Sequence, residues 1–346
     1  MVPHAFKLPE VQLATTRVDG RQVSLDRLDE FLNKHHVLGI FGLPDLPKTP
    51  LQVPQAQITF EAHDDHPGAE VWTSDHPVSH LQFGRLTLAH DGDTLMGSVS
   101  FDADGETLEQ ETNTLYRQIL DCCEELGFAF LYRIWNYMPD INGFCPSGLE
   151  RYRAFCLGRA RAFFEERDRV EAFLPAGTGI GSHGDQVSII FMAARRECRI
   201  NMENPRQVPA YHYPTTYGPR SPSFSRGTLV RRADADEIFV SGTSSIIGHK
   251  TVHAGDIEKQ CQITFKNIDT LLSRENLTRY GIKGGSGSGE MDLVKVFIRR
   301  QQDWPIVQAI CSQHLNPGAQ VMYLGADICR SDLLVEVEGR VRLEHA

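Results

Sequence analysis

An internal repetition of folding units constrains the fold of this chain more than any other feature. In the first unit, an apolar strand over 95–101 leads into a helix whose apolar residues recur at helical spacing. Gly127 follows that helix, and a glycine just past a helix end supplies the positive φ that stops it. A strand over 128–135, a second helix over about 148–167 and a strand over 187–194 complete the unit.

The same order of elements returns about 140 residues later, a period longer than that of a solenoid. The elements predicted in this second unit are strands over 238–241, 293–298, 320–323 and 333–337, and helices over 256–272 and 304–315. This alternation predicts an α/β (α+β) fold of mixed sheets with helices packed on one face, built from two pseudo-repeats.

The region before the repeat, residues 1 to about 95, is rich in Pro, His and Asp, which favours short strands joined by long loops. We divide the chain into an N-terminal domain over 1–145, which includes the start of the first unit, and a C-terminal domain over 146–346. The Gly/Ser run at 284–289 is flexible by composition and predicts a loop tip.

The charge balance argues against nucleic acid as a partner. The chain has 35 basic and 45 acidic residues, a formal net charge of -10, whereas a nucleic-acid binder presents a basic surface. A small anionic substrate stays open, because a local arginine cluster outweighs charges that lie beyond a screening length of roughly 8 Å.

Cysteine usage and the amino terminus indicate the compartment. The eight cysteines form no CxxC pair and no zinc spacing, so we expect free thiols and no metal. The first residues, MVPHAFKLPE, lack the charged start and apolar core of a secretion signal, and no run approaches ~18 apolar residues. We therefore expect a cytoplasmic protein that does not cross a membrane.

Several strings of the second unit resemble those of the YjgF-type enamine/imine deaminases. They are SGT at 241–243, DIEKQ at 256–260, LVKVFI at 293–298 and CRSDLLVEVE at 329–338. Longer strings resemble the chorismatases, enzymes that remove pyruvate from chorismate. These are PAYHY at 209–213, YGPRSPSF at 217–224, FVSGTSSIIGH at 239–249 and VEVEG at 335–339.

The resemblance implies a YjgF-like fold, similar also to the trimeric chorismate mutases, with the site between the two pseudo-repeats and no cofactor. It implies that chorismate is the substrate and that 3-hydroxybenzoate and pyruvate are the products, with 4-hydroxybenzoate as a further product in the bifunctional synthases of pigment biosynthesis. A pseudo-repeat can replace a subunit junction, so we expect a monomer.

Three alternatives stay open. A hydrolytic chorismatase would give a dihydroxycyclohexadiene carboxylate and pyruvate. The YjgF-like unit alone would allow an imine deaminase, and a non-catalytic aromatic-acid binder would use the same pocket without turnover.

Residues 333–338 alternate between apolar and polar side chains, so Glu336 and Glu338 lie on one face, about 6.5–7 Å apart along the strand. Acidic residues on one strand face are commonly solvated. The resemblance instead implies that Glu336 is the catalytic acid/base. A carboxylic acid shielded from water has a raised pKa and can protonate the terminal methylene of an enolpyruvyl ether.

In the helix that starts near residue 148, Arg159 shares a stripe with Tyr152 and several apolar residues. Arg159 could cover apolar surface with its stem while its charge reaches water. A buried guanidinium would instead need a carboxylate partner, either a protein acid or a substrate. The resemblance favours the substrate, with Tyr152 beside it.

Four further residues are candidates for substrate binding. Tyr211 and Tyr213 would share a face if their segment is extended, where they are either half-buried strand residues or hydrogen-bond donors to the substrate. Arg220 lies in a Gly-Pro-Arg-Ser-Pro turn that suits an anion ligand, although many surface turns look the same. By resemblance, Arg330 corresponds to the YjgF arginine that grips a substrate carboxylate.

Gly242 and Cys329 bear on the product. By resemblance, a glycine after the Val-Ser strand and a cysteine seven residues before the catalytic glutamate are typical of the benzoate-forming chorismatases. Removing side-chain bulk at Gly242 changes where the ring and any water can sit. Cys329 could equally be a small buried apolar residue without a chemical role.

Overall fold

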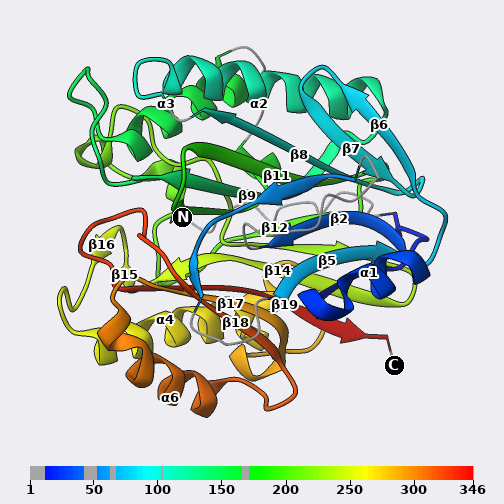
Figure 1. Ribbon diagram of the computed structural model, residues 1–346. Coiled ribbons are helices and arrows are strands. Elements are labelled where there is room, and N and C mark those ends of the chain that lie inside the picture. Colours follow the sequence, from blue (N-terminus) through cyan, green and yellow to red (C-terminus); the bar gives the residue numbers. More distant parts are fainter. Residues whose placement is uncertain (1–11, 43–52, 63–67, 103, 166–170, 346) are drawn as a thin grey trace.

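Two mixed sheets stack face to face, and each has helices on its outer face (Figure 1). The computed structural model describes residues 12–42, 53–62, 68–102, 104–165 and 171–345. Apolar side chains from both sheets meet in the layer between them, among them Trp135, Phe239 and Phe297. The predicted mixed α/β architecture is therefore confirmed.

The first sheet has the strand order β10-β9-β11-β8-β7-β6. These strands are β6 (Ser79–Phe83), β7 (Leu86–His90), β8 (Thr94–Asp102), β9 (Phe130–Pro139), β10 (Ala176–Ser182) and β11 (Gln186–Ala194). Helices α2 (Leu108–Glu125) and α3 (Arg151–Phe164) cover its outer face through a shared apolar core. Gly127 follows α2 with φ 73°, as its place after the helix predicts.

The second sheet has the strand order β12-β13-β14-β19-β17-β18-β4. These strands are β4 (Glu61–Ala62), β12 (Arg199–Met202), β13 (Gly227–Arg231), β14 (Ala235–Ser244), β17 (Met291–Ile298), β18 (Gln320–Gly325) and β19 (Val335–Glu344). Helices α4 (Ile257–Leu272) and α6 (Trp304–His314) cover it, with the short α5 (Arg274–Thr278) after α4. Asp256 caps α4 by accepting a hydrogen bond from the Lys259 backbone N–H at 3.1 Å.

The pairing pattern confirms the predicted repeat. β10 pairs with β9 in parallel, and β9, β11 and β8 follow as antiparallel neighbours. In the second sheet β18 pairs with β17 in parallel, and β17, β19 and β14 follow in the same way. Each unit thus has the same strand order and the same pair of covering helices.

Strand β10 was not predicted, and its glycines explain why. The segment alternates Gly177, Gly179 and Gly181 with other residues, so it lacks the bulky alternation that marks a strand. A Cβ on Gly179 would lie 3.1 Å from the ring of Tyr152, so this glycine lets the tyrosine of α3 approach the sheet closely. β9 also runs on to Pro139, past the predicted strand end.

The second predicted helix is shorter than expected. It begins at Arg151 because Gly148, with φ 77°, holds a turn before it, and it ends at Phe164. Residues 166 and 167 of the predicted helix lie outside the described residues.

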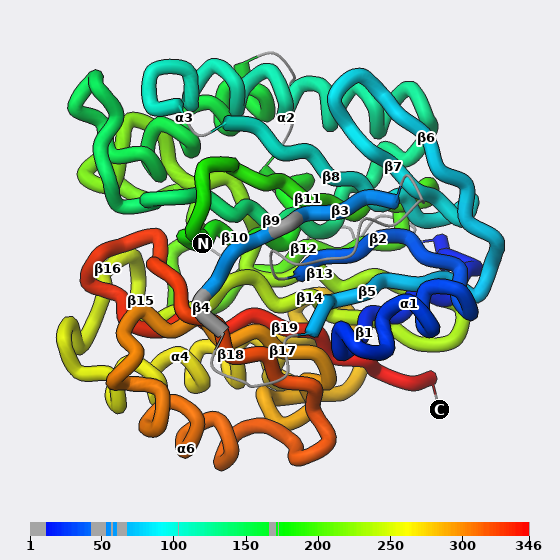
Figure 2. The backbone as a smooth tube through the Cα atoms, in the orientation of Figure 1, coloured from blue at the N-terminus to red at the C-terminus, as the bar shows by residue number. Residues whose placement is uncertain are grey.

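The N-terminal region forms a third sheet of order β1-β5-β2-β3 beside the other two (Figure 2). It comprises β1 (Val18–Ser24), β2 (His36–Gly42), β3 (Gln55–Gln57) and β5 (Gly68–Ser74), with helix α1 (Leu25–Lys34) between β1 and β2. The strands agree with the expectation, whereas α1 was missed, although its residues Leu25, Leu28, Phe31 and Leu32 recur at helical spacing and pack in the core of this region. The domain boundary at 145/146 stays a prediction.

Short elements complete the described part of the chain. They are the hairpin of β15 (Ile246–Ile247) and β16 (Lys250–Thr251), and the 3₁₀ turns Glu171–Phe173, Ala210–His212, Thr215–Tyr217, Ser288–Glu290 and Gln301–Asp303. In the described part of the chain no helix is both long and apolar enough to span a membrane.

Candidate active site

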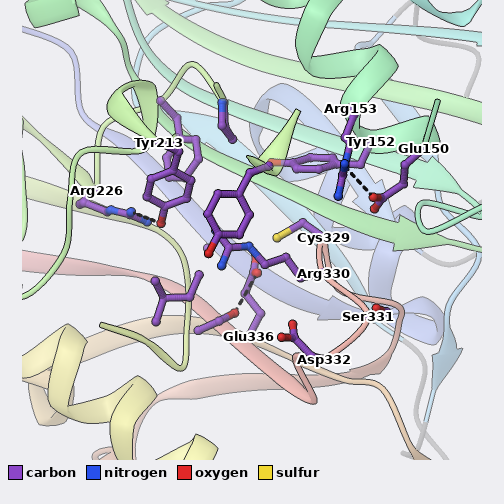
Figure 3. Close-up of a pocket in the computed structure, with 16 residues that line it drawn as sticks. Glu150, Tyr152, Arg153, Tyr213, Arg226, Cys329, Arg330, Ser331, Asp332 and Glu336 are labelled. Atoms are coloured by element: carbon purple, nitrogen blue, oxygen red, sulfur yellow. Dashed lines mark hydrogen bonds and ion pairs between the residues drawn. The ribbon is translucent and has the colours of Figure 1, made fainter. Parts of the chain in front are cut away.

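One cavity of about 240 Å³ opens between the two units (Figure 3). The first unit contributes the start of α3, and the second contributes β14, β19 and the loop before β19. The lining residues are Glu150, Tyr152, Arg153, Tyr213, Tyr217, Pro222, Phe224, Arg226, Gly242, Ser244, Ile246, Cys329, Arg330, Ser331, Asp332 and Glu336.

Glu336 lies at the base of this cavity. Its side chain comes from β19 and the residue is 3% exposed. The Ser244 hydroxyl donates a hydrogen bond to Glu336 Oε2 at 3.0 Å. Burial, as the largest cause, raises the pKa of Glu336 to about 8, so this carboxyl keeps its proton at neutral pH.

Gly242 makes the position of that carboxyl possible. A Cβ built on Gly242 would lie 2.0 Å from Glu336 Oε1, so any larger residue at this position would displace the carboxyl. The acid therefore rests against the bare Cα of a glycine on the neighbouring strand β14.

Glu338, two residues further along β19, is buried as well but has the opposite electrostatic surroundings. Lys295 Nζ lies 2.9 Å from Oε1 and Arg133 Nη2 lies 2.7 Å from Oε2. These cations outweigh the effect of burial and lower the pKa of Glu338, so this carboxyl is ionised. The prediction that the two glutamates share a face is confirmed, and the alternative of a solvated face is wrong.

Two arginines face the cavity with neutral partners. Arg330 Nη1 donates to the His249 carbonyl at 2.9 Å, and its guanidinium lies 3.9 Å from the ring centroid of Tyr217. Arg226 is 3% exposed and donates through Nη2 to the Tyr213 hydroxyl at 2.7 Å and to the Val208 carbonyl at 3.0 Å. The buried carboxyl of Glu203 also acts on the Arg226 charge, but neither guanidinium forms an ion pair among the described residues, so both can meet an anion in the cavity.

The six other predicted site residues divide into three that line the cavity and three that do not. Tyr152, Tyr213 and Cys329 line it together with Glu336 and Arg330, although they come from segments far apart in the sequence. Burial keeps Tyr152 a neutral phenol by raising its pKa far above the usual value. Burial likewise raises the pKa of Cys329, so its thiol is not an ionised nucleophile.

Arg159 does not line the cavity. It is 3% exposed, with its guanidinium 5.4 Å from the Phe155 ring and 5.9 Å from the Tyr116 ring. The prediction of an apolar environment is confirmed, and the alternative in which the charge reaches water is wrong. Nε and Nη2 of Arg159 have no hydrogen-bond partner among the described residues.

Tyr211 and Arg220 also lie outside the lining. Residues 210–212 form a 3₁₀ turn, so the expected extended segment, with both tyrosines on one face, is wrong. Only Tyr213 reaches the cavity. Arg220 is exposed and forms an ion pair with Glu165 at 2.7 Å.

Sequence reasoning gave no role to Arg226, Ser244 or Tyr217. Ser244 and Tyr217 stand inside the strings 239–249 and 217–224, and Arg226 follows the second of these by two residues. The strings that carry the resemblance therefore contain or adjoin all three residues. Their place in the cavity could not be predicted, because the loop that carries Tyr217 and Arg226 has no periodic pattern. Within the described ranges, no group of three His, Cys, Asp or Glu residues is arranged to hold a metal.

Comparisons with known proteins agree on one family. The family description "Chorismatase FkbO/Hyg5-like, N-terminal" matches residues 70–193. A 3-hydroxybenzoate synthase of Streptomyces hygroscopicus is 42% identical over 83% of this chain and 85% of its own length. A chorismatase of the same organism is 39% identical over 83% of each chain. A chorismatase crystal structure superposes with a TM-score of 0.89 at 36% identity, covering 95% of this chain and all of the other.

We predict that the Glu336→Gln variant is more stable than the native protein, and that the difference grows as pH rises. The unfolded chain releases the Glu336 proton near pH 4.5, while the folded chain holds it to about pH 8, so raising pH through this window favours unfolding of the native protein. The variant lacks this cost, and its melting temperature should exceed that of the native protein by roughly 5 °C at pH 8 and by little at pH 5.

Glu338→Gln is the matched control for this measurement by differential scanning fluorimetry. It leaves Lys295 and Arg133 without their shared carboxylate and should lower the melting temperature at pH 8. A Glu336→Gln variant with the same pH dependence as the native protein would contradict the assignment of a protonated Glu336.

Proposed function

This chain belongs to the chorismatase family, and from that premise we propose that it converts chorismate into 3-hydroxybenzoate and pyruvate, with Glu336 as the acid. One observation carries the proposal. A buried, protonated carboxyl stands at the base of a cavity that two arginines with neutral partners also face.

Substrate binding follows from the charges. Chorismate has two carboxylates, which we assign to Arg330 and Arg226, with Tyr152, Tyr213 and Tyr217 around the ring. A protonated Glu336 adds no negative charge against this dianion. Arg159 stays a candidate for a carboxylate, because its Nε and Nη2 have no hydrogen-bond partner among the described residues, although it does not line the cavity.

In the chemical step Glu336 gives its proton to the terminal methylene carbon of the enolpyruvyl ether, which produces an oxocarbenium ion. General acid catalysis of this kind contributes typically 10²–10⁴-fold. The bond between the ring carbon and the ether oxygen breaks, and pyruvate leaves with that oxygen as its keto group. The neighbouring ring hydroxyl attacks this ring carbon as the bond breaks and gives its proton to the Glu336 carboxylate, which restores the acid. The epoxide formed in this way opens at the carbon that first carried the hydroxyl. Transfer of a proton from the other epoxide carbon to the oxygen then gives 3-hydroxybenzoate, without water, oxidant or reductant.

The product is the finer part of the proposal. Gly242 and Cys329 both line the cavity, and a relative 42% identical is a 3-hydroxybenzoate synthase, which supports the benzoate-forming reaction. A hydrolytic reaction would add one water and give a dihydroxycyclohexadiene carboxylate instead. A second product, 4-hydroxybenzoate, a role in pigment biosynthesis, the monomeric state and the cytoplasmic location stay predictions.

The proposed reaction is tested by coupling pyruvate release from chorismate to lactate dehydrogenase. The native protein should release pyruvate, and kcat/KM should fall tenfold per pH unit above about pH 8, because the acid must start protonated. Glu336→Gln should lose at least about 100-fold in kcat. If the native protein released pyruvate no faster than this variant, the chain would be a chorismate binder without catalysis.

The two lining arginines should matter for substrate affinity. Lysine keeps the charge but not the two-point geometry, so Arg330→Lys and Arg226→Lys should each raise KM by roughly tenfold. Arg220→Lys is the matched control, since Arg220 pairs with Glu165 at the surface. If only Arg220→Lys raised KM, Arg220 would be a substrate-binding residue and the assignment of Arg330 and Arg226 would be wrong.

Gly242→Ala tests the contact that seats the acid. The added Cβ would force Glu336 Oε1 away, and a displacement of about 1 Å can cost about 100-fold in rate. The remaining turnover, separated by chromatography, should move away from 3-hydroxybenzoate. Gly318→Ala, whose Cβ would make an ordinary contact of 3.4 Å, should keep native rate and product. Native behaviour of Gly242→Ala would contradict this role.

A further inference from the structure

A chain of four buried charges joins the N-terminal sheet to the strand that holds Glu336. Glu70 of β5 lies 2.8 Å from Lys295 Nζ of β17, and the same Nζ lies 2.9 Å from Glu338 of β19. Arg133 of β9 closes the chain at 2.7 Å from Glu338. The charges alternate in sign, so the chain as a whole is neutral.

Neutral groups from the same strands complete this chain. The Trp72 indole N–H donates to Glu70 Oε1 at 2.7 Å, and the Trp135 indole N–H donates to Glu338 Oε1 at 3.0 Å. Lys295 Nζ also donates to the Tyr137 hydroxyl at 3.2 Å. All four charged side chains are a tenth exposed or less, so an unpaired charge here would be costly.

One hydroxyl connects the chain to the seat of the acid. Thr178 Oγ1 of β10 donates to Glu338 Oε2 and accepts from Arg133 Nη2 at 2.7 Å. It also accepts from the Gly242 backbone N–H at 3.2 Å. Gly242 is the residue against which Glu336 Oε1 rests, so the chain acts on Glu336 through the backbone as well as through charge.

We infer that Glu70, which belongs to neither repeated unit, is a positioning residue for Glu336: through Lys295 and Glu338 it completes the neutral charge chain beside the acid. The inference rests on the proposed function. The N-terminal sheet thereby contributes to the reaction, although none of its described residues lines the cavity.

The charges that face these groups set the direction of the effect. Glu336 faces Glu338, Arg226 and Arg133, and the negative charge of Glu338 raises the pKa of Glu336 while the two arginines lower it. Further along β19, Arg340 pairs with Asp292, Asp19 and Glu237. Without Glu70 the remaining three linked side chains have a net positive charge. This charge favours the ionised form of Glu336.

Glu70→Gln tests the inference through the pH dependence of pyruvate release. Glu70 reaches Glu338 through contacts of 2.8 and 2.9 Å, and Glu336 lies about 7 Å further along β19, a total on the order of 12 Å. At this separation and an effective dielectric of ~20, a unit charge changes a pKa by about one unit. The alkaline limb of kcat should therefore move down by about one pH unit, a loss of roughly tenfold at pH 9 and little at pH 6. KM should stay as in the native protein, because Arg330 and Arg226 are untouched.

Three variants separate this effect from a loss of stability. Glu70→Gln with Lys295→Gln removes one charge of each sign and should return the limb to its native position or above. Glu70→Asp draws the carboxylate back by one methylene, should give a smaller shift of the same sign, and serves if Glu70→Gln does not fold. Glu237→Gln removes a buried carboxylate that pairs with Arg232 at 2.5 Å and should not move the limb.

An unshifted limb in Glu70→Gln and Glu70→Asp, or an equal shift in Glu237→Gln, would overturn the inference while the native protein still releases pyruvate. A native protein that releases no pyruvate from chorismate would overturn the proposed function itself. The two failures are therefore distinguishable.

Discussion

The arrangement depends on how the buried charge of Glu338 is satisfied. This carboxylate receives hydrogen bonds from Arg133, Trp135, Thr178 and Lys295, which stand on three strands besides its own. Removing one partner of a buried pair typically costs 3–5 kcal/mol, because the other charge is left without compensation. The pairing therefore holds the two sheets in one relative position, and that position sets the geometry of the cavity beside it.

The same pairing explains how two carboxyl groups on one strand take different protonation states. Glu338 has cations within 3 Å, whereas Glu336 has a serine hydroxyl and the Cα of a glycine. Environments that separate the pKa values of two neighbouring acids are a recurring way to obtain one acid that is protonated at neutral pH. In this protein the ionised neighbour itself contributes, since its charge raises the pKa of Glu336.

The periodicity of the sequence correctly predicted those side-chain positions that regular strands and helices determine. The alternation over 333–338 placed both glutamates on one face, and the helical stripe placed Arg159 among apolar side chains. Periodicity could not predict which arginines meet in the cavity. Arg226 reaches it through a non-repetitive segment, 213–226, and Arg220 of the same segment turns to the surface and pairs with Glu165. Side chains held by loops depend on long-range packing, which leaves no local pattern in the sequence.

The duplication also explains why the site needs the whole chain. The second unit supplies both glutamates, Gly242 and Arg330, whereas the first supplies Tyr152 to the cavity and Arg133, Trp135 and Thr178 to the charge of Glu338. Neither unit alone contains both the Glu336 carboxyl and all the groups that surround the two glutamates. The two copies have the same strand order but different chemistry at equivalent strands, because the carboxylates stand on β19 and their cations and donors stand partly on β9 and β10. Duplication thus creates an interface inside one chain, and the buried Glu336 carboxyl lies on it.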